Sequence, residues 1–152
     1  MSIKIAILPV TPFQQNCSIV WCEATNKAAI VDPGGDADRI AEAVKEIGVE
    51  VEKVLLTHGH IDHAAAATEI AEKYGVEIEG PEKSDAPFLA SLPEQGEKWG
   101  IPARPAHPAR WLSQGDTVTV GELVFEVRHC PGHTPGHVIY LYAPQKIAIV
   151  GD

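Results

Sequence analysis

The sequence feature that most constrains this chain is a short run of metal-binding side chains, Thr57-His58-Gly59-His60-Ile61-Asp62-His63. Three imidazoles and a carboxylate lie so close together that a packed core could not leave them unpaired without a large desolvation cost. His58 and His60 are two residues apart, so extended backbone directs both side chains to one side, where they can bind one cation. Asp62 and His63 follow at the point where the apolar pattern changes from that of a strand to that of a helix. The backbone turns there, so this pair points in a different direction from His58 and His60. The run predicts two adjacent cations, and the alternative, a histidine-rich surface turn, leaves the alternation of ligand types unexplained.

Strand-like and helix-like segments alternate on both sides of this run. Asp32 and the histidine run each follow an apolar strand, and ligands of open α/β sheets gather beyond the carboxyl ends of strands. Asp36 or Asp38 can cap a helix that carries Ile40, Val44 and Ile47 on one face and ends at Gly48. We expect strands at 3–7, 18–22, 27–31, 51–57 and 76–79, and a second helix over 64–74 that ends at Gly75.

The second half of the chain is expected to be rich in strands. Residues 81–108 contain many prolines and charges, and we interpret them as a covering segment with one helix near 85–92. In and after this segment we expect His107 to be exposed and Trp99 and Trp111 to be packing residues, although either tryptophan could form a wall of the substrate pocket. Further strands are expected at 117–120, 123–127, 138–142 and 147–150.

A second group of histidines lies in a loop stiffened by proline and glycine, His129-Cys130-Pro131-Gly132-His133-Thr134-Pro135-Gly136-His137. His133 is held between Gly132 and Thr134, and it is the expected third ligand of the metal bound by His58 and His60. His129 and His137 stand at strand ends, so we expect them to support the ligands or the fold. Asp152 follows an apolar strand, and its carboxylate is expected to bridge the two cations rather than to be a solvated terminus.

Composition narrows the function classes. A net charge of -9 disfavours binding to a phosphate backbone, so we expect a small-molecule substrate and no nucleic acid. No apolar run approaches the roughly 18 residues that span a bilayer, and a cytoplasmic location with no membrane partner is the expectation. The odd number of cysteines lacks paired metal-binding spacing, so Cys17, Cys22 and Cys130 are expected to be reduced and mostly buried. A place near the metal is the alternative for Cys130, because it precedes Pro131-Gly132-His133. The length fits a single domain, 1–152, and the oligomeric state is left open.

Taken together, these motifs resemble those of the metallo-β-lactamase superfamily. The closest resemblance is to the short bacterial type II glyoxalase-like hydrolases, the hydroxyacylglutathione hydrolases, and it covers the whole chain. It implies an α/β (α+β) fold, the αββα sandwich of that superfamily, truncated after the bridging aspartate because family members continue past it. The motifs that carry it are Asn16-Cys17, Val31-Asp32-Pro33-Gly34-Gly35, Leu56-Thr57-His58-Gly59-His60 with Asp62-His63, Cys130-Pro131-Gly132-His133-Thr134-Pro135-Gly136-His137, and Gly151-Asp152.

The resemblance also implies the roles of the site residues. His58, His60 and His133 would bind one metal, Asp62 and His63 the other, and Asp152 both, while Asp32 and His137 would support the ligands and Asp62 would also be catalytic. The cofactor would be two divalent ions, with zinc expected and iron or manganese as alternatives.

The implied activity is hydrolysis of a thioester such as S-lactoylglutathione by a water activated between the metals. Its rivals are a persulfide dioxygenase of the same fold, a lactone or other ester hydrolase, and a metal-binding fragment without activity. Residues that bind the substrate are not identified by the sequence.

Overall fold

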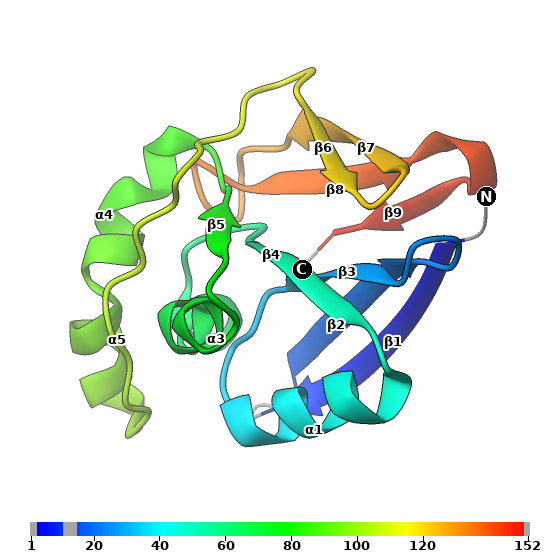
Figure 1. Ribbon diagram of the computed structural model, residues 1–152. Helices are drawn as coiled ribbons and strands as arrows, with labels where there is room; N and C mark the ends of the chain where they lie inside the picture. Colours follow the sequence, from blue (N-terminus) through cyan, green and yellow to red (C-terminus); the bar gives the residue numbers. More distant parts are fainter. Residues whose placement is uncertain (1–2, 11–14, 151–152) are drawn as a thin grey trace.

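The computed structural model describes residues 3–10 and 15–150, in which two β-sheets pack face to face (Figure 1). The first sheet has the order β1 (Ile3–Val10), β2 (Gln15–Cys22), β3 (Lys27–Val31), β4 (Glu50–Leu55) and β5 (Glu77–Glu79). Strand β2 pairs with β1 on one side and with β3 on the other, both antiparallel, whereas β3, β4 and β5 run parallel. The parallel strands all direct their carboxyl ends to the same edge of the sheet.

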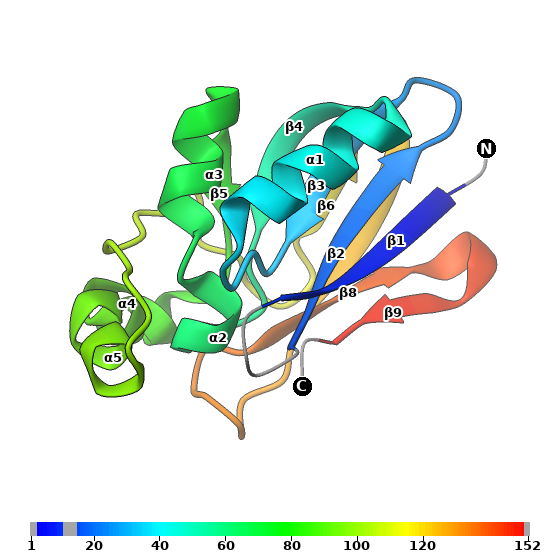
Figure 2. The ribbon, with the colours of Figure 1, turned by 90° about the horizontal axis from the view of Figure 1, so that it is seen from below.

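Two helices cover the outer face of this first sheet, as Figure 2 shows from below. Helix α1 (Ala37–Ile47) buries Ile40 and Val44, and helix α3 (Ala67–Tyr74) buries Ile70 and Ala71 against the sheet. Each helix connects two neighbouring parallel strands, because a parallel pair needs a crossover connection. The hydrophobic residues between helices and sheet form the first of two cores.

The second sheet is antiparallel and encloses the second core against the first sheet. Its strands alternate buried and exposed positions, as expected when one face of an antiparallel sheet is packed. Phe125 and Tyr140 fill the space between the sheets together with Val20 and Leu55 of the first sheet. The order is β6 (Thr117–Val120), β7 (Leu123–His129), β8 (Val138–Tyr142) and β9 (Ile147–Ile149), with a 3-10 turn η2 (Ala143–Gln145) before the last strand.

The expected mixed α/β fold with a two-sheet sandwich is confirmed. Every predicted strand occurs, and Cys17 and Cys22 of β2 face different cores, as their spacing predicted. Among the residues that the structure describes, helices cover the outer face of the first sheet, and none covers that of the second (Figure 1). Those same residues contain no helix that is both long and apolar enough to cross a membrane.

The prediction of one helix over 64–74 is wrong. The chain forms a short helix α2 (Ile61–Ala64) and then α3, with a break at Ala66. The backbone N–H of Ala66 donates to the carbonyl of Pro33 at 2.9 Å, which diverts it from the helical hydrogen-bond ladder. The loop that follows β3 therefore lies against the start of the helical region, where a Cβ on Gly34 would come within 1.8 Å of the Asp62 carbonyl oxygen.

The covering segment is more helical than predicted. Instead of one helix near 85–92, it contains a 3-10 turn η1 (Lys83–Asp85), α4 (Ala86–Ala90) and α5 (Leu92–Trp99). Pro93 stands in the first turn of α5, where no N–H is needed, and Gly96 lies where a Cβ would come within 2.0 Å of the Ile101 carbonyl oxygen. The cap prediction for α1 is also corrected, because Asp36 occupies the N-cap position in a left-handed conformation without a side-chain capping bond.

Candidate metal centre

The two histidine groups of the sequence meet at the edge where β3 and β4 end. Asp32 follows β3 directly, and the run from His58 to His63 follows β4 and enters α2. The loop between β7 and β8 approaches from the second sheet, where the Val138 N–H donates to the Thr57 carbonyl at 2.8 Å. The predicted location beyond the carboxyl ends of parallel strands therefore agrees with the structure.

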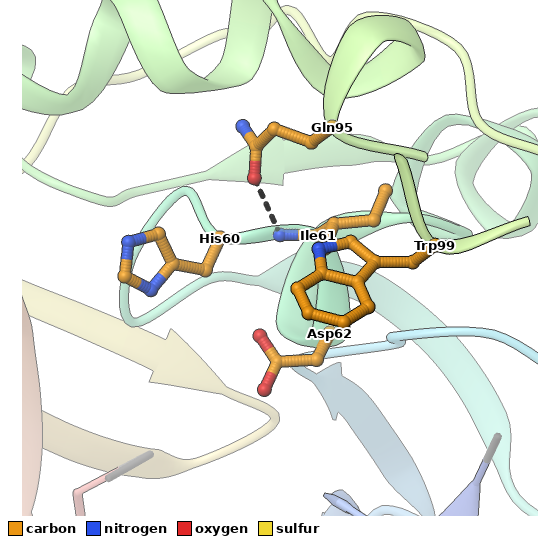
Figure 3. A pocket seen from close by; sticks show the side chains of 5 residues that line it. All are labelled: His60, Ile61, Asp62, Gln95 and Trp99. Atoms are coloured by element: carbon orange, nitrogen blue, oxygen red, sulfur yellow. Dashed lines mark hydrogen bonds between the residues drawn. The ribbon is translucent and has the colours of Figure 1, made fainter. Parts of the chain in front are cut away.

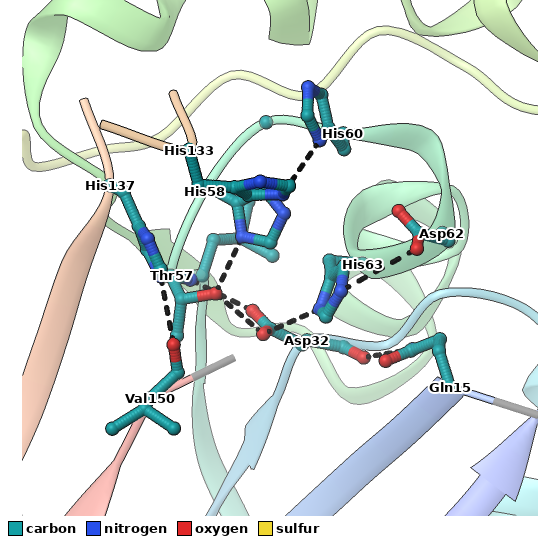
Figure 4. Close-up of polar contacts among 12 residues, drawn as sticks. Gln15, Asp32, Thr57, His58, His60, Asp62, His63, His133, His137 and Val150 are labelled. Atoms are coloured by element: carbon teal, nitrogen blue, oxygen red, sulfur yellow. Dashed lines mark hydrogen bonds and ion pairs between the residues drawn. The ribbon is translucent and has the colours of Figure 1, made fainter. Parts of the chain in front are cut away.

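His58, His60 and His133 converge on one point, as Figure 4 shows. One ring nitrogen from each lies within 4.8 Å of the others, and His60 Nδ1 is 3.2 Å from His133 Nε2. Nitrogens about 2.1 Å from a tetrahedral ion lie about 3.4 Å from one another, so this spacing suits a shared cation. The set combines two residues that follow the first sheet with one from the second sheet.

Asp62 and His63 form a second pair of donors beside this group. His63 Nε2 lies 3.6 Å from Asp62 Oδ2, a separation too long for a hydrogen bond but suited to two ligands of one ion. The other ring nitrogen, Nδ1, contacts Asp32 Oδ2 at 2.9 Å. That contact fixes the ring so that Nε2 is turned toward Asp62.

Asp32 is the buried residue that holds this second pair in place. Its carboxylate accepts hydrogen bonds from the Thr57 N–H at 2.8 Å and the Thr57 hydroxyl at 2.6 Å, in addition to the His63 contact. Asp32 also falls within 4.8 Å of ligand atoms of His58 and His63, which makes it a geometric candidate for a metal ligand. Its three contacts are all with residues of the histidine run, which suits the supporting role that the sequence predicts for it.

The protonation state of His58 suits metal binding. Burial, followed by the neighbouring imidazoles of His63, His137, His60 and His133, lowers the pKa of His58 to about 2. Burial and His133 also lower the pKa of His60. Both rings are therefore neutral at pH 7, which is the form that coordinates a cation. A cluster of neutral imidazoles with an adjacent carboxylate is a donor set that fits zinc and is also found with iron.

Asp85 is a site residue that the sequence interpretation did not identify. It is fully buried, and it accepts hydrogen bonds from the Gly59 N–H at 2.9 Å, the Thr134 hydroxyl at 2.7 Å and the Gly136 N–H at 2.8 Å. These donors belong to the two loops that carry His58, His60 and His133. Asp85 therefore connects the two ligand loops from behind. In the sequence it is one acidic residue in a segment rich in charge, and no local pattern distinguishes it.

The remaining histidines lie around the centre or away from it. His137 Nε2 contacts the Val150 carbonyl oxygen at 2.8 Å, and its ring lies 4.9 Å from that of His58. His129 Nε2 contacts the Pro135 carbonyl oxygen at 2.8 Å within its own loop. His107 is exposed, as predicted.

Three further expectations have different outcomes. Cys130 is exposed, so its predicted burial is wrong. Trp99 is 54% exposed and lines a pocket beside the centre, so it is not the packing residue that was predicted. Asp152, the predicted bridging ligand, lies outside the described residues.

Comparisons with known proteins point to one family. The sequence pattern that defines the metallo-beta-lactamase superfamily matches residues 10–152. The chain is similar to the hydroxyacylglutathione hydrolase GloC of Haemophilus influenzae, with 44% identity over 151 residues that make up 98% of this chain and 71% of the relative.

Solved structures agree with the sequence match. The BLEG-1 B3 metallo-beta-lactamase superposes with a TM-score of 0.84 at 27% identity, over 97% of this chain and 71% of that one. TTHA1623, solved in a di-iron-bound form, superposes with a TM-score of 0.84 at 25% identity, over 95% of this chain and 70% of that one.

Proposed function

The chain belongs to the metallo-β-lactamase superfamily, and from that membership we propose that it hydrolyses thioesters such as S-lactoylglutathione at a centre of two metal ions. It is a metal-dependent hydrolase by the class of its relatives. The observation that carries the proposal is the convergence of His58, His60 and His133 within 4.8 Å, with the Asp62–His63 pair beside them. The similarity to GloC, at 44% identity, favours a thioester over the β-lactam suggested by BLEG-1, at 27%.

Each ligand has a proposed place in the centre. His58, His60 and His133 hold the first ion, and His63 with Asp62 holds the second. Asp152 would be shared by both ions, as the resemblance to the superfamily implies. Zinc is the proposed metal, and iron is the principal alternative because TTHA1623 was solved with two iron ions.

In the proposed hydrolysis, the metal ions and the side chains of the protein have different roles. Divalent cations, when bound, lower the pKa of water from 15.7 toward about 7 and stabilise negative charge on a carbonyl oxygen. Asp62 is half-buried beside His63, and we infer that its carboxylate orients the attacking water and accepts its proton. The leaving group is a thiolate, which departs from the acyl carbon without a strong general acid.

The test combines metal analysis with activity. Purified protein loaded with zinc, iron or manganese is assayed for hydrolysis of S-lactoylglutathione by release of the thiol. Hydrolysis that depends on the metal and is lost in the His58→Ala variant is the expected result. Metal-loaded protein that hydrolyses no thioester above background would overturn the proposal.

Two rival activities are separated in the same samples. Oxygen uptake with glutathione persulfide would identify a persulfide dioxygenase, because a hydrolase consumes no oxygen. Opening of a lactone without thioester hydrolysis would identify a different esterase of the same fold.

A further inference from the structure

A pocket of about 280 Å³ opens beside the candidate metal centre (Figure 3). Two of its walls, His60 and Asp62, belong to the two different ligand sets. A group bound in this pocket therefore lies next to the reacting atoms. The other walls are Ile61, Gln95 and Trp99.

Helix α5 fixes the outer wall of this pocket against the ligand run. The Gln95 side chain accepts a hydrogen bond from the Ile61 N–H at 2.9 Å and donates to the Phe88 carbonyl at 2.9 Å and to the Ser91 hydroxyl at 3.2 Å. These contacts use both ends of the amide. Gln95 is thus a structural wall with little hydrogen-bonding capacity left for a ligand.

Trp99 supplies the apolar surface of the pocket. Its indole stands one turn after Gln95 at the end of α5, and Figure 3 shows it beside Ile61 and above Asp62. It is 54% exposed, and it is the only aromatic among the large exposed hydrophobic side chains of the described residues. A large apolar surface at the rim of a pocket is typical of a ligand-binding wall.

The lining of the pocket does not suit the charged glutathione part of a thioester substrate. The lining contains the Asp62 carboxylate and neither lysine nor arginine. Lys98, the nearest cation along α5, has its Nζ 5.7 Å from the centroid of the Trp99 ring and is not a lining residue. With Asp62 engaged as a ligand, no lining side chain offers a cation to pair with the carboxylates of glutathione, whereas an uncharged acyl group needs no such partner.

We propose that this pocket binds the acyl group of the thioester, with Trp99 as its apolar wall, an inference that rests on the proposed thioesterase function. The pocket's volume of about 280 Å³ is many times the roughly 10–15 Å³ that one water molecule requires by the same measure, so a three-carbon lactoyl group leaves much of it unfilled. The preferred substrates are thioesters with longer aliphatic or aromatic acyl groups. The hydroxyl of a lactoyl group adds little binding energy, because the Gln95 amide already makes its hydrogen bonds within the protein.

The test uses a series of glutathione thioesters with one thiol and different acyl groups, namely acetyl, propionyl, lactoyl, butyryl, hexanoyl and benzoyl. For the zinc-loaded protein we expect kcat/KM to rise up to about fourfold per added methylene, the factor that corresponds to ~0.8 kcal/mol per buried CH₂. Lactoyl and propionyl should differ little. Trp99→Ala should flatten the rise, mainly through KM. Trp99→Phe should restore most of the rise, and Glu94→Ala, at an exposed position of the same helix that does not line the pocket, is the matched control.

Failure of the inference and failure of the proposed function give different results. Hydrolysis of the acetyl thioester with the same length dependence in Trp99→Ala as in the native chain would overturn the inference alone. A flat profile in the native chain would also overturn it. Absence of all thioester hydrolysis would overturn the proposed function.

A binding measurement tests the pocket without turnover. S-hexylglutathione, a thioether that cannot be hydrolysed, should protect the exposed Trp99 of zinc-loaded protein from quenching by acrylamide. Glutathione alone should protect it at least tenfold less well at equal concentration. Equal protection by both, or protection by neither, would contradict acyl binding at Trp99.

Discussion

Among the single residues of the centre, His60 contacts both a second candidate ligand and the adjoining pocket. Its Nδ1 lies 3.2 Å from His133 Nε2, its ring packs edge-on to Phe88 with centroids 5.5 Å apart, and its side chain lines the acyl pocket. A partly exposed histidine with its pKa lowered by burial and by a second imidazole is suited to bind a cation. This makes His60 a direct test of the ligand assignment.

His60→Ala should remove the first metal and abolish thioester hydrolysis. Supporting residues already change metal affinity by about 10–100-fold, so loss of a ligand should weaken binding by more than about 100-fold. Elemental analysis after dialysis measures the metal, and thiol release measures turnover. His107→Ala is the matched control, because His107 is exposed and outside the centre. Native metal content in His60→Ala would show that another residue completes the set.

The convergence of the candidate metal ligands could be predicted from the sequence, whereas Asp85, which connects their loops, could not. His58, His60 and His63 stand in one short run, and local chain geometry alone brings them near one another. Asp85 acts on Gly136 across 51 residues through backbone N–H donors, which every residue except proline possesses. Nothing in the sequence distinguishes those donors from others.

At the scale of secondary-structure elements, the sequence predicted the strands but not the boundaries of the short helices. Strand positions follow from alternating hydrophobicity, and all expected strands are present. The break between α2 and α3 depends on the Pro33 carbonyl, which captures the Ala66 N–H from a distant loop. Helix α5 was missed because Pro93 and Gly96 lower helix propensity, although the fold places each where it is tolerated.

Asp85→Asn should loosen the connection between the two ligand loops. Either orientation of the asparagine amide places its NH₂ against at least one N–H or O–H donor, which leaves a buried group unsatisfied at a cost of about 1–3 kcal/mol. We expect metal affinity to fall by about 10–100-fold. Competition titration with a chelating dye measures the affinity.

Two controls separate alignment of the loops from general loss of stability. Ser84→Ala changes an exposed neighbour in the same turn and should leave metal affinity unchanged. Gly48→Ala introduces a side chain at a φ of +81° far from the site, so it should lower the melting temperature without weakening metal binding. Native affinity in Asp85→Asn would contradict a role for Asp85 in aligning the ligands.

Gly34→Ala should disturb the second metal selectively. A Cβ at Gly34 would lie 1.8 Å from the Asp62 carbonyl oxygen and 2.4 Å from Gln15 Nε2, so the loop after β3 and the start of α2 must separate. Asp62 and His63 are carried on α2, whereas His58 and His133 are not. We expect one metal equivalent to be lost while the other remains, as measured by titration of metal-free protein. Retention of two equivalents of equal affinity would contradict the assignment of Asp62 and His63 to the second ion.

At the scale of the whole molecule, metal binding should contribute to the stability of the two-sheet sandwich. The histidines of the centre come from loops attached to both sheets, so the folded state binds the cation far better than the unfolded chain. Ligand at 100 times its dissociation constant stabilises a folded protein by about 2.7 kcal/mol. Removal of metal with a chelator should therefore lower the melting temperature by several degrees, and zinc should restore it.

The His58→Ala variant provides the control for this stabilisation. His58 is fully buried and lies among four other imidazole rings, so its loss should remove most of the response to zinc. Calorimetry of the native chain and the variant, each with and without zinc, gives the comparison. An equal response to zinc in both proteins would show that the stabilising ion binds elsewhere.

The separation of His60 and His133 along the chain, 73 residues, also has a consequence for the order of folding. The first-sheet loop can form its own contacts early, but its imidazoles meet His133 only after β7 and β8 have docked on the first sheet. Contacts between such distant residues form late, because the loop-closure entropy must be overcome before they contribute energy. Capture of the ion by all three imidazoles is thus a late event on the folding pathway, and the colour of bound cobalt would mark the moment at which the two halves of the sandwich come together.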